Sequence, residues 1–236
     1  MSDNVGGDPA ARLQAVLERM ANAARRAGRD PAELTLVAVS KTRPVADLQA
    51  LIDCGQHHFG ENYLQEALPK IDALRPRPLV WHFIGQLQSN KTAPVAEYFD
   101  WVHTVDRLKL VQRLAAQRPF HAPPLKVCVQ VKLEEEPTKG GATVDELPAL
   151  LEAVACAPQL ELRGLMTLPP EETAEADQRR WFAALREIFL RMQRQHPTLD
   201  TLSMGMSGDL EAAILEGATM IRIGTALFGE RLQSQA

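Results

Sequence analysis

The sequence is poor in the features that mark several classes of protein. It holds only three cysteines in 236 residues, Cys54, Cys128 and Cys156, an odd number without metal-ligand spacing. Neither a disulfide scaffold nor a cysteine metal site is expected, and each cysteine lies in an apolar stretch that suits a buried free thiol in a reducing compartment. No apolar run approaches the roughly 20 residues that span a bilayer, and the N-terminus lacks a signal peptide's cationic and apolar regions. We therefore expect a cytoplasmic protein with no membrane partner.

An excess of basic residues is also absent. Lysine and arginine number 26 against 30 aspartates and glutamates, which gives a formal net charge of −4. Because nucleic acids are held by a positive field, we expect none as a partner. His57 and His58 are adjacent and would point to opposite faces of a strand, so they predict no metal site.

Short apolar segments alternate with helical patterns along the chain. Residues 9–27 have apolar positions at helical spacing and end at Gly28, which predicts a helix before the first strand. The predicted strands are residues 34–40, 57–60, 79–85, 101–105, 126–131, 161–167, 201–204 and 220–223. Helical candidates between them include residues 45–54, 63–74, 107–117, 144–155, 175–195 and 209–216.

This alternation predicts a parallel sheet that is covered on both faces. Eight βα units can close without a free edge, so we expect a single-domain (β/α)8 barrel over residues 1–236, with residues 1–8 disordered. The alternative is an open doubly wound sheet. That fold usually carries a glycine-rich turn after its first strand, and Ser40–Pro44 contains no glycine.

Lys41 closes the apolar run of the first predicted strand. The carboxyl ends of strands are where α/β folds keep their chemistry, and a lysine partly desolvated in a cleft can attack a carbonyl. Schiff-base chemistry is therefore the first hypothesis. The alternative is a solvated lysine that begins a loop.

Two glycine-containing loops follow the last two predicted strands, at residues 204–209 and 221–226. Barrels often bind phosphate between these loops, and Ser207 and Thr225 would add hydroxyl donors, although ordinary tight turns remain the alternative. Arg222 lies inside the last strand and needs a partner there. A ring nitrogen or a carboxylate in the barrel mouth would serve, as would a salt bridge to Glu61.

The segment after the third strand superficially resembles a nucleotide-binding loop. The residue before Lys91 should be glycine in such a loop and is Asn90, which argues against ATP or GTP. His82 precedes this segment, and a lone histidine is more often a core residue. Its neighbours Gln86 and Asn90 favour a polar wall of the cleft instead.

Six motifs on successive strand ends resemble those of the pyridoxal phosphate homeostasis protein family, whose members are similar to the N-terminal barrel of alanine racemase. The motifs are Val39-Ser40-Lys41-Thr42, Phe59 to Glu66, His82 to Lys91, Gly164-Leu165-Met166-Thr167, Ser203-Met204-Gly205-Met206-Ser207 and Arg222-Ile223-Gly224-Thr225. The resemblance implies pyridoxal 5'-phosphate (PLP) as cofactor.

The resemblance further implies a Schiff base on Lys41 and Arg222 facing the pyridine nitrogen. It assigns the phosphate to Ser207, Gly224 and Thr225, and the walls of the ring pocket to Asn62, His82 and Met166. Lys132 stands where the family usually has asparagine, and Lys139 matches a second, weaker cofactor-reactive lysine.

A cation beside the ring nitrogen makes PLP a poor electron sink. The related racemases take a second base from a domain after the barrel, whereas this sequence ends soon after Gly229. We therefore expect a monomeric protein without catalysis of its own that buffers PLP and delivers it to apo-enzymes. The alternative is a PLP-dependent amino-acid racemase or lyase that uses His82 or Lys139 as base.

Overall fold

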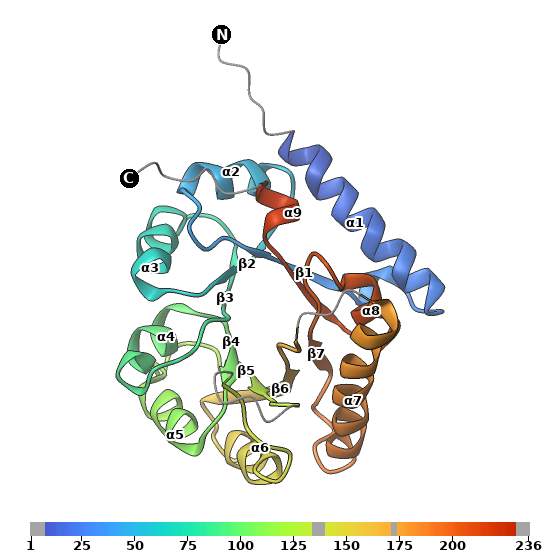
Figure 1. Ribbon diagram of the computed structural model, residues 1–236. Helices are drawn as coiled ribbons and strands as arrows, with labels where there is room; N and C mark the ends of the chain where they lie inside the picture. The colour runs from blue at the N-terminus through green and yellow to red at the C-terminus, as the bar shows by residue number, and fades with distance from the viewer. Residues whose placement is uncertain (1–7, 134–139, 171–173, 230–236) are drawn as a thin grey trace.

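The chain forms a closed barrel of eight parallel strands that pair in chain order, with β1 closing on β8 (Figure 1). The computed structural model describes residues 8–133, 140–170 and 174–229. The strands are β1 (Thr35–Val39), β2 (His58–Glu61), β3 (Val80–Phe83), β4 (Trp101–Val105), β5 (Leu125–Gln130), β6 (Leu160–Met166), β7 (Thr201–Ser203) and β8 (Met220–Ile223). The predicted (β/α)8 barrel is confirmed.

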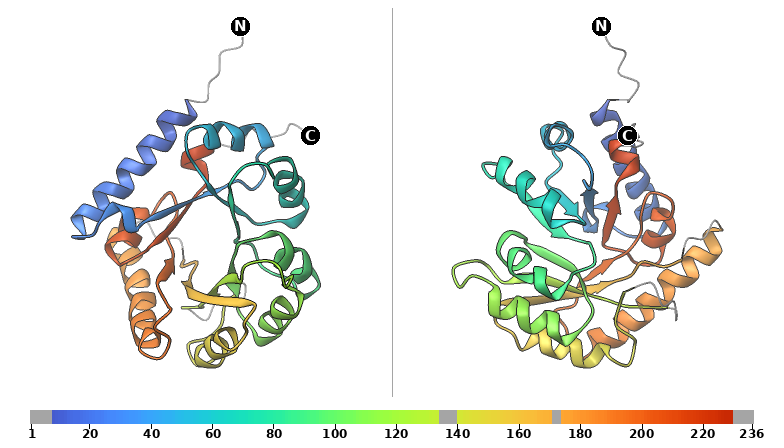
Figure 2. Two further views of the ribbon diagram at one scale, coloured as in Figure 1. Left: turned by 180° about the vertical axis from the view of Figure 1, so that it is seen from behind. Right: turned by 60° about the vertical axis from the view of Figure 1, so that its left-hand side comes forward.

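Helices surround the barrel, and α1 (Pro9–Arg26) lies along its outside beside α8, as both figures show (Figures 1 and 2). Asp8 caps α1 by accepting from the N–H of Ala10 at 3.1 Å. The other residues of the segment predicted to be disordered, 1–7, lie outside the described residues. The other helices are α2 (Val45–Asp53), α3 (Leu64–Ala73), α4 (Thr92–Tyr98), α5 (Leu108–Gln117), α6 (Leu147–Ala155), α7 (Glu175–Gln193), α8 (Leu210–Leu215) and α9 (Thr225–Phe228), with short 3-10 turns η1 (Pro31–Glu33) and η2 (Ser89–Lys91).

Two short helices were not among the predicted ones. Helix α4 has seven residues with Pro94 in its first turn, and α9 has four residues. Neither is long enough to display a 3.6-residue repeat of apolar positions. The longer periodic segments were located to within a few residues.

The prediction of three buried thiols was wrong for two of them. All three cysteines are free, but only Cys128, inside β5, is buried. Cys54 and Cys156 each follow the last residue of a helix, where the chain turns at the surface, and they are exposed. The apolar residues beside them face the core from within α2 and α6.

Side-chain alternation along the strands divides the interior into two layers. The larger layer lies between strands and helices and includes Leu36 and Ala38 of β1. A separate cluster joins Val37, Trp101, Cys128, Met166 and Met220, which come from five different strands. Because several of these strands are not neighbours, their side chains meet only in the lumen of the barrel.

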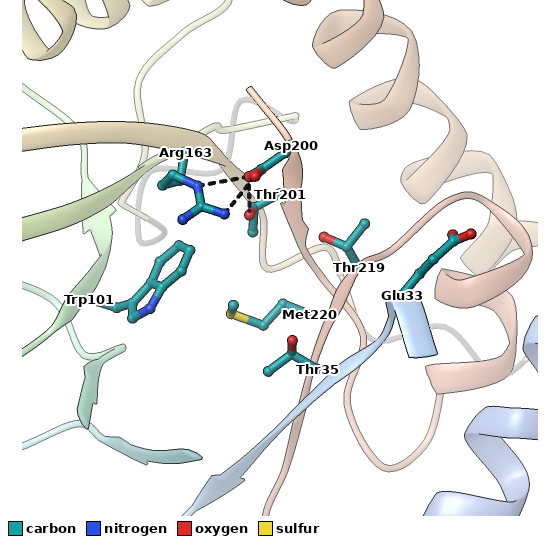
Figure 3. A pocket seen from close by; sticks show the side chains of 8 residues that line it. All are labelled: Glu33, Thr35, Trp101, Arg163, Asp200, Thr201, Thr219 and Met220. Carbon is teal, nitrogen blue, oxygen red and sulfur yellow. Dashed lines mark hydrogen bonds and ion pairs between the residues drawn. The ribbon is translucent and has the colours of Figure 1, made fainter. Parts of the chain in front are cut away.

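The amino-terminal mouth of the barrel carries a pocket of about 390 Å³ (Figure 3). Arg163 donates to both carboxylate oxygens of Asp200, at 3.0 and 2.5 Å, and Thr201 Oγ1 donates to Asp200 Oδ1 at 2.8 Å. Three of the polar side chains that line this pocket are thus bonded to one another. The residues singled out from the sequence lie at the carboxyl-terminal side of the strands.

No helix in the described part of the chain is long and apolar enough to cross a membrane.

Candidate functional site

Lys41 follows the end of β1 by two residues and is half-buried. The residues on either side of it are both anchored. The N–H of Ser40 donates to the carbonyl of Gly60 at 2.9 Å, and the N–H of Thr42 donates to Glu66 Oε2 at 2.6 Å. Thr42 has a φ of +63°, a left-handed conformation that a β-branched residue rarely adopts. The backbone that carries the Lys41 amine is therefore held in one geometry from both sides.

A buried ion pair lies directly behind this loop. Lys70 of α3 places its Nζ 2.7 Å from Glu61 Oε1 and donates to the carbonyl of Ser40 at 2.8 Å, while Ser40 Oγ donates to the same carboxylate at 2.6 Å. Glu61 is fully buried, and burial raises its pKa although Lys70 and Ser40 oppose that shift. The pair connects α3 with the backbone immediately before Lys41.

Arg222 is buried inside the barrel, two residues after Met220 of the lumen cluster. Its Nη1 donates to Ser203 Oγ at 2.7 Å and its Nη2 donates to the carbonyl of Thr167 at 3.1 Å. Burial lowers the pKa of Arg222 to about 10, so it stays a cation at neutral pH. The alternative salt bridge to Glu61 does not form, because the Glu61 carboxylate is bonded to Ser40 and to Lys70 of α3 instead.

The ends of β8 and β1 lie side by side. Val37 pairs with Arg222 in the parallel register, and a Cβ added to Gly224 would lie 3.5 Å from the carbonyl oxygen of Val39. Lys41, two residues beyond Val39, and Gly224 are thus brought to one edge of the barrel. Thr225 is exposed and begins the short helix α9.

Two further predicted residues, Met166 and Ser207, reach the same end of the barrel. Met166 ends β6, is fully buried and pairs in register with Ser203, the partner of Arg222. Ser207 is half-buried in the loop after β7, and the carbonyl of Gly205 in that loop accepts from the N–H of Arg222 at 3.0 Å.

Asn62 follows β2, and its buried Oδ1 has no hydrogen-bond partner among the described residues. Gly85 after β3 packs against it so closely that an added Cβ would lie 2.1 Å from the Asn62 carbonyl oxygen. Asn62 and Gln86 also line a pocket of about 580 Å³ that extends to Lys91. Gln86 therefore lines a pocket together with Asn62, but His82, for which the polar wall was predicted, is not among the residues that line it.

His82 has a different environment from the one that we expected. It is fully buried in the lumen, where its Nε2 lies 3.0 Å from His58 Nδ1 and its Nδ1 lies 2.9 Å from His103 Nε2. Both ring nitrogens are therefore engaged by other histidines. Burial, then the neighbouring His103 and His58, hold the pKa of His82 well below its usual value.

No prediction from the sequence gave a role at the site to Lys70, His103 or Ser203. The ring of His103 continues the chain from His82, with Nδ1 lying 2.8 Å from Ser203 Oγ. A polar residue inside an apolar strand, as in Trp101-Val102-His103, was the available signal, but its partners come from distant strands. Lys132 is half-buried after β5 and its N–H donates to the carbonyl of Ala142 at 2.9 Å, whereas Lys139 lies outside the described residues.

Comparisons with known proteins show the family of this chain. A family model of the alanine racemase N-terminal domain matches residues 11–232. The pyridoxal phosphate homeostasis protein of Pseudomonas aeruginosa is 56% identical over 216 residues, which cover 92% of this chain and 93% of that protein. The chain belongs to the pyridoxal phosphate homeostasis protein family.

Solved structures show the same relationship. PipY from Synechococcus elongatus PCC7942, determined with PLP bound, is 40% identical, with a TM-score of 0.79 over 91% of this chain and 100% of that chain. Alanine racemase from Corynebacterium glutamicum is 19% identical, with a TM-score of 0.64 over 95% of this chain and 62% of the racemase. This second likeness is one of fold. It shows that the barrel of this homeostasis-family protein is the racemase type of barrel.

Replacing Lys70 by methionine should destabilise the protein by about 3–5 kcal/mol, because Glu61 would be left as an unpaired buried charge. Urea denaturation at neutral pH measures this loss. The double variant Lys70→Met with Glu61→Gln should recover part of it, and Lys91→Met, at an exposed lysine, should cost little. Equal losses for Lys70→Met and Lys91→Met would contradict the described ion pair.

The lumen histidines should make stability depend on pH. Burial, then the Arg222 charge, lowers the pKa of folded His103 to about 3, below its unfolded value, so stability is retained above about pH 6.5 and lost as the pH falls toward about 3. His103 alone should account for about 2 kcal/mol of loss between about pH 7.5 and about pH 5.

The matched measurement compares urea denaturation at both pH values for the wild type, His103→Gln and His121→Gln. The first variant should lose about 2 kcal/mol less on acidification than the wild type. The second, at an exposed histidine, should behave as the wild type does. An unchanged loss in His103→Gln would show that His103 does not stay neutral in the folded protein.

Proposed function

We propose that this protein binds PLP at the carboxyl ends of β1 and β8 and holds it as a Schiff base on Lys41. The observation that carries the proposal is the meeting of Lys41, Arg222 and Gly224 at one edge of the barrel. The family's name and the PLP-bound structure of PipY support the same cofactor. When bound, PLP supplies an aldehyde that combines reversibly with amines.

The residues present suit the parts of this cofactor. The Lys41 amine, on a backbone fixed by Glu66 and Lys70, matches the aldehyde. Arg222 offers a fixed cation for the ring nitrogen. Asn62 has a buried oxygen without a hydrogen-bond partner in the described part of the chain, which suits a polar ring substituent. Met166 supplies an apolar wall for the ring.

The phosphate is assigned to the loops after β7 and β8. Gly224 leaves room for a close approach of the main chain, and Ser207 and Thr225 carry hydroxyl donors. The N–H of Arg222 in β8 donates a hydrogen bond to the carbonyl of Gly205, which ties the loop after β7 to β8. Ring and phosphate contacts would therefore be held in a fixed relation.

The role we propose is buffering of free PLP and its delivery to apo-enzymes, by a monomeric protein in the cytoplasm. Arg222 remains charged, and a cation beside the ring nitrogen opposes protonation of that nitrogen. A ring that stays unprotonated is a weak electron sink, so carbanion chemistry is disfavoured. The site suits reversible storage of the aldehyde better than turnover of amino acids.

The alternative of a racemase or lyase needs a second base. His82 does not fit that role, because both of its ring nitrogens face other histidines inside the lumen and its pKa is well below the usual value. The other base named from the sequence, Lys139, lies outside the described residues. The geometry of His82 therefore argues against it as the second base and supports the storage role.

Incubation with PLP followed by borohydride should leave a stable pyridoxyl phosphate adduct on Lys41, because reduction converts the carbon–nitrogen double bond to a single bond. Peptide mapping by mass spectrometry locates the adduct. It should vanish in Lys41→Ala and persist in Lys91→Ala, which removes an exposed lysine of the neighbouring pocket. An unmodified Lys41 in the wild type would overturn the central assignment.

If the protein delivers PLP, the PLP-loaded protein should reactivate a PLP-dependent apo-enzyme. The rate of reactivation should exceed the rate that passive dissociation of PLP into solution allows. The comparison uses equal total PLP and adds a PLP-trapping amine that consumes the free aldehyde. Equal sensitivity of loaded protein and free PLP to the trap would remove the delivery step. Rapid deuterium exchange at Cα of amino acids in heavy water would instead support the racemase or lyase.

A further inference from the structure

A chain of hydrogen-bonded side chains crosses the lumen and ends at Arg222 of the site described above. His58 Nδ1 lies 3.0 Å from His82 Nε2, His82 Nδ1 lies 2.9 Å from His103 Nε2, and His103 Nδ1 lies 2.8 Å from Ser203 Oγ. Arg222 Nη1 completes the chain at 2.7 Å from the same hydroxyl. The chain thus runs from half-buried His58, at the start of β2, to the arginine assigned to the ring nitrogen.

Ser203 decides the direction of these hydrogen bonds. A guanidinium only donates, so the Ser203 hydroxyl must accept from Arg222. The hydroxyl has one proton of its own, and His103 is its only other side-chain partner among the described residues. Donation from Ser203 Oγ to His103 Nδ1 therefore satisfies every group, whereas the reverse would leave the buried hydroxyl proton without an acceptor.

The tautomers of all three imidazoles follow from that direction. If His103 accepts at Nδ1, its proton is on Nε2 and points at His82 Nδ1, so His82 carries its proton on Nε2 as well. The proton on His82 Nε2 in turn points at His58 Nδ1, so His58 accepts at Nδ1 and carries its own proton on Nε2. Each imidazole then turns its lone pair toward the Arg222 side of the chain, an orientation that the buried cation favours.

The surroundings keep the three histidines of the chain uncharged at neutral pH. Burial is the largest cause that lowers the pKa of each of the three histidines. Charged and titratable groups act mainly at the ends: Lys126, Asp100 and His57 near His58, and Asp209 near Arg222, beside the protonated thiol of Cys128. Among the described residues, no group of three histidine, cysteine or carboxylate side chains is placed to hold a metal ion.

We propose that Ser203 and His103 are positioning residues for Arg222, and that a chain of Nε2–H imidazoles running to His58 fixes their polarity. Ser203 and the Thr167 carbonyl hold two guanidinium nitrogens, which leaves the remaining N–H groups of Arg222 in a set direction. The proposal rests on the proposed function, in which Arg222 faces the ring nitrogen. It adds residues from β2, β3, β4 and β7 to the support of the cofactor site.

The polarity of the chain can be tested in the protein without cofactor. Long-range ¹H–¹⁵N correlation spectra of ¹⁵N-labelled protein at neutral pH distinguish protonated from unprotonated ring nitrogens, and single His→Gln variants assign the signals. His58, His82 and His103 should each show a proton on Nε2 and none on Nδ1. A proton on Nδ1 of His103 would overturn the proposal.

The positioning role is tested with Ser203→Ala, which removes the hydroxyl that Arg222 and His103 share. Thr201→Val is the matched control, because it removes a buried hydroxyl of the same strand that bonds to Asp200 instead. Ser203→Ala should weaken PLP binding about tenfold, as expected for loss of one hydrogen bond to a charged group, and should release His103 from the single tautomer. Thr201→Val should change neither.

The outcomes separate this proposal from the proposed function. If the wild type takes up no PLP, the proposed function fails, and the spectra still decide the polarity of the histidine chain. If the wild type binds PLP and Ser203→Ala binds it equally well with unchanged His103 signals, the positioning role fails alone. If Ser203→Ala does not fold, two other measurements decide the question. They are the histidine tautomers of the wild type and the affinity of His103→Gln for PLP, which should also fall.

Discussion

Closure of a parallel sheet into a barrel buries both faces of every strand, and the rest of this structure depends on that constraint. Successive side chains must alternate between a layer shared with the helices and a narrow lumen. The first layer is filled by leucine, valine, alanine and phenylalanine. The lumen is lined more by polar and polarizable groups, with Arg222, Cys128, two methionines and a chain of histidines. The two faces of one strand therefore serve different purposes.

Polar groups in both layers are tolerated because they are bonded to one another. Glu61 and Lys70 pair in the outer layer, behind the loop that carries Lys41, and Arg222 is held in the lumen by Ser203 and a backbone carbonyl. An unpaired charge at either place would cost several kcal/mol. The two networks lie on opposite faces of the sheet and approach the same edge of the barrel, at the ends of β1 and β8.

The site that we propose on this racemase type of barrel favours binding over turnover. In the proposed site, the Arg222 cation beside the ring nitrogen and a His82 whose ring nitrogens both face other histidines work against proton transfer at an amino acid. The anchored backbone around Lys41 keeps an amine ready for reversible combination with an aldehyde. The proposed storage role follows from these opposing features of a single site.

The sequence by itself determined the barrel, the order of its elements and the strand ends that carry Lys41, Arg222 and Gly224, because periodicity and turn residues are local properties of the chain. Family motifs named the cofactor. Only the tertiary structure decided the partners: Lys70 for Glu61, Ser203 for Arg222, and two histidines for His82. These contacts join residues on different strands and helices, and their register is set by closure of the whole barrel, which no single segment encodes.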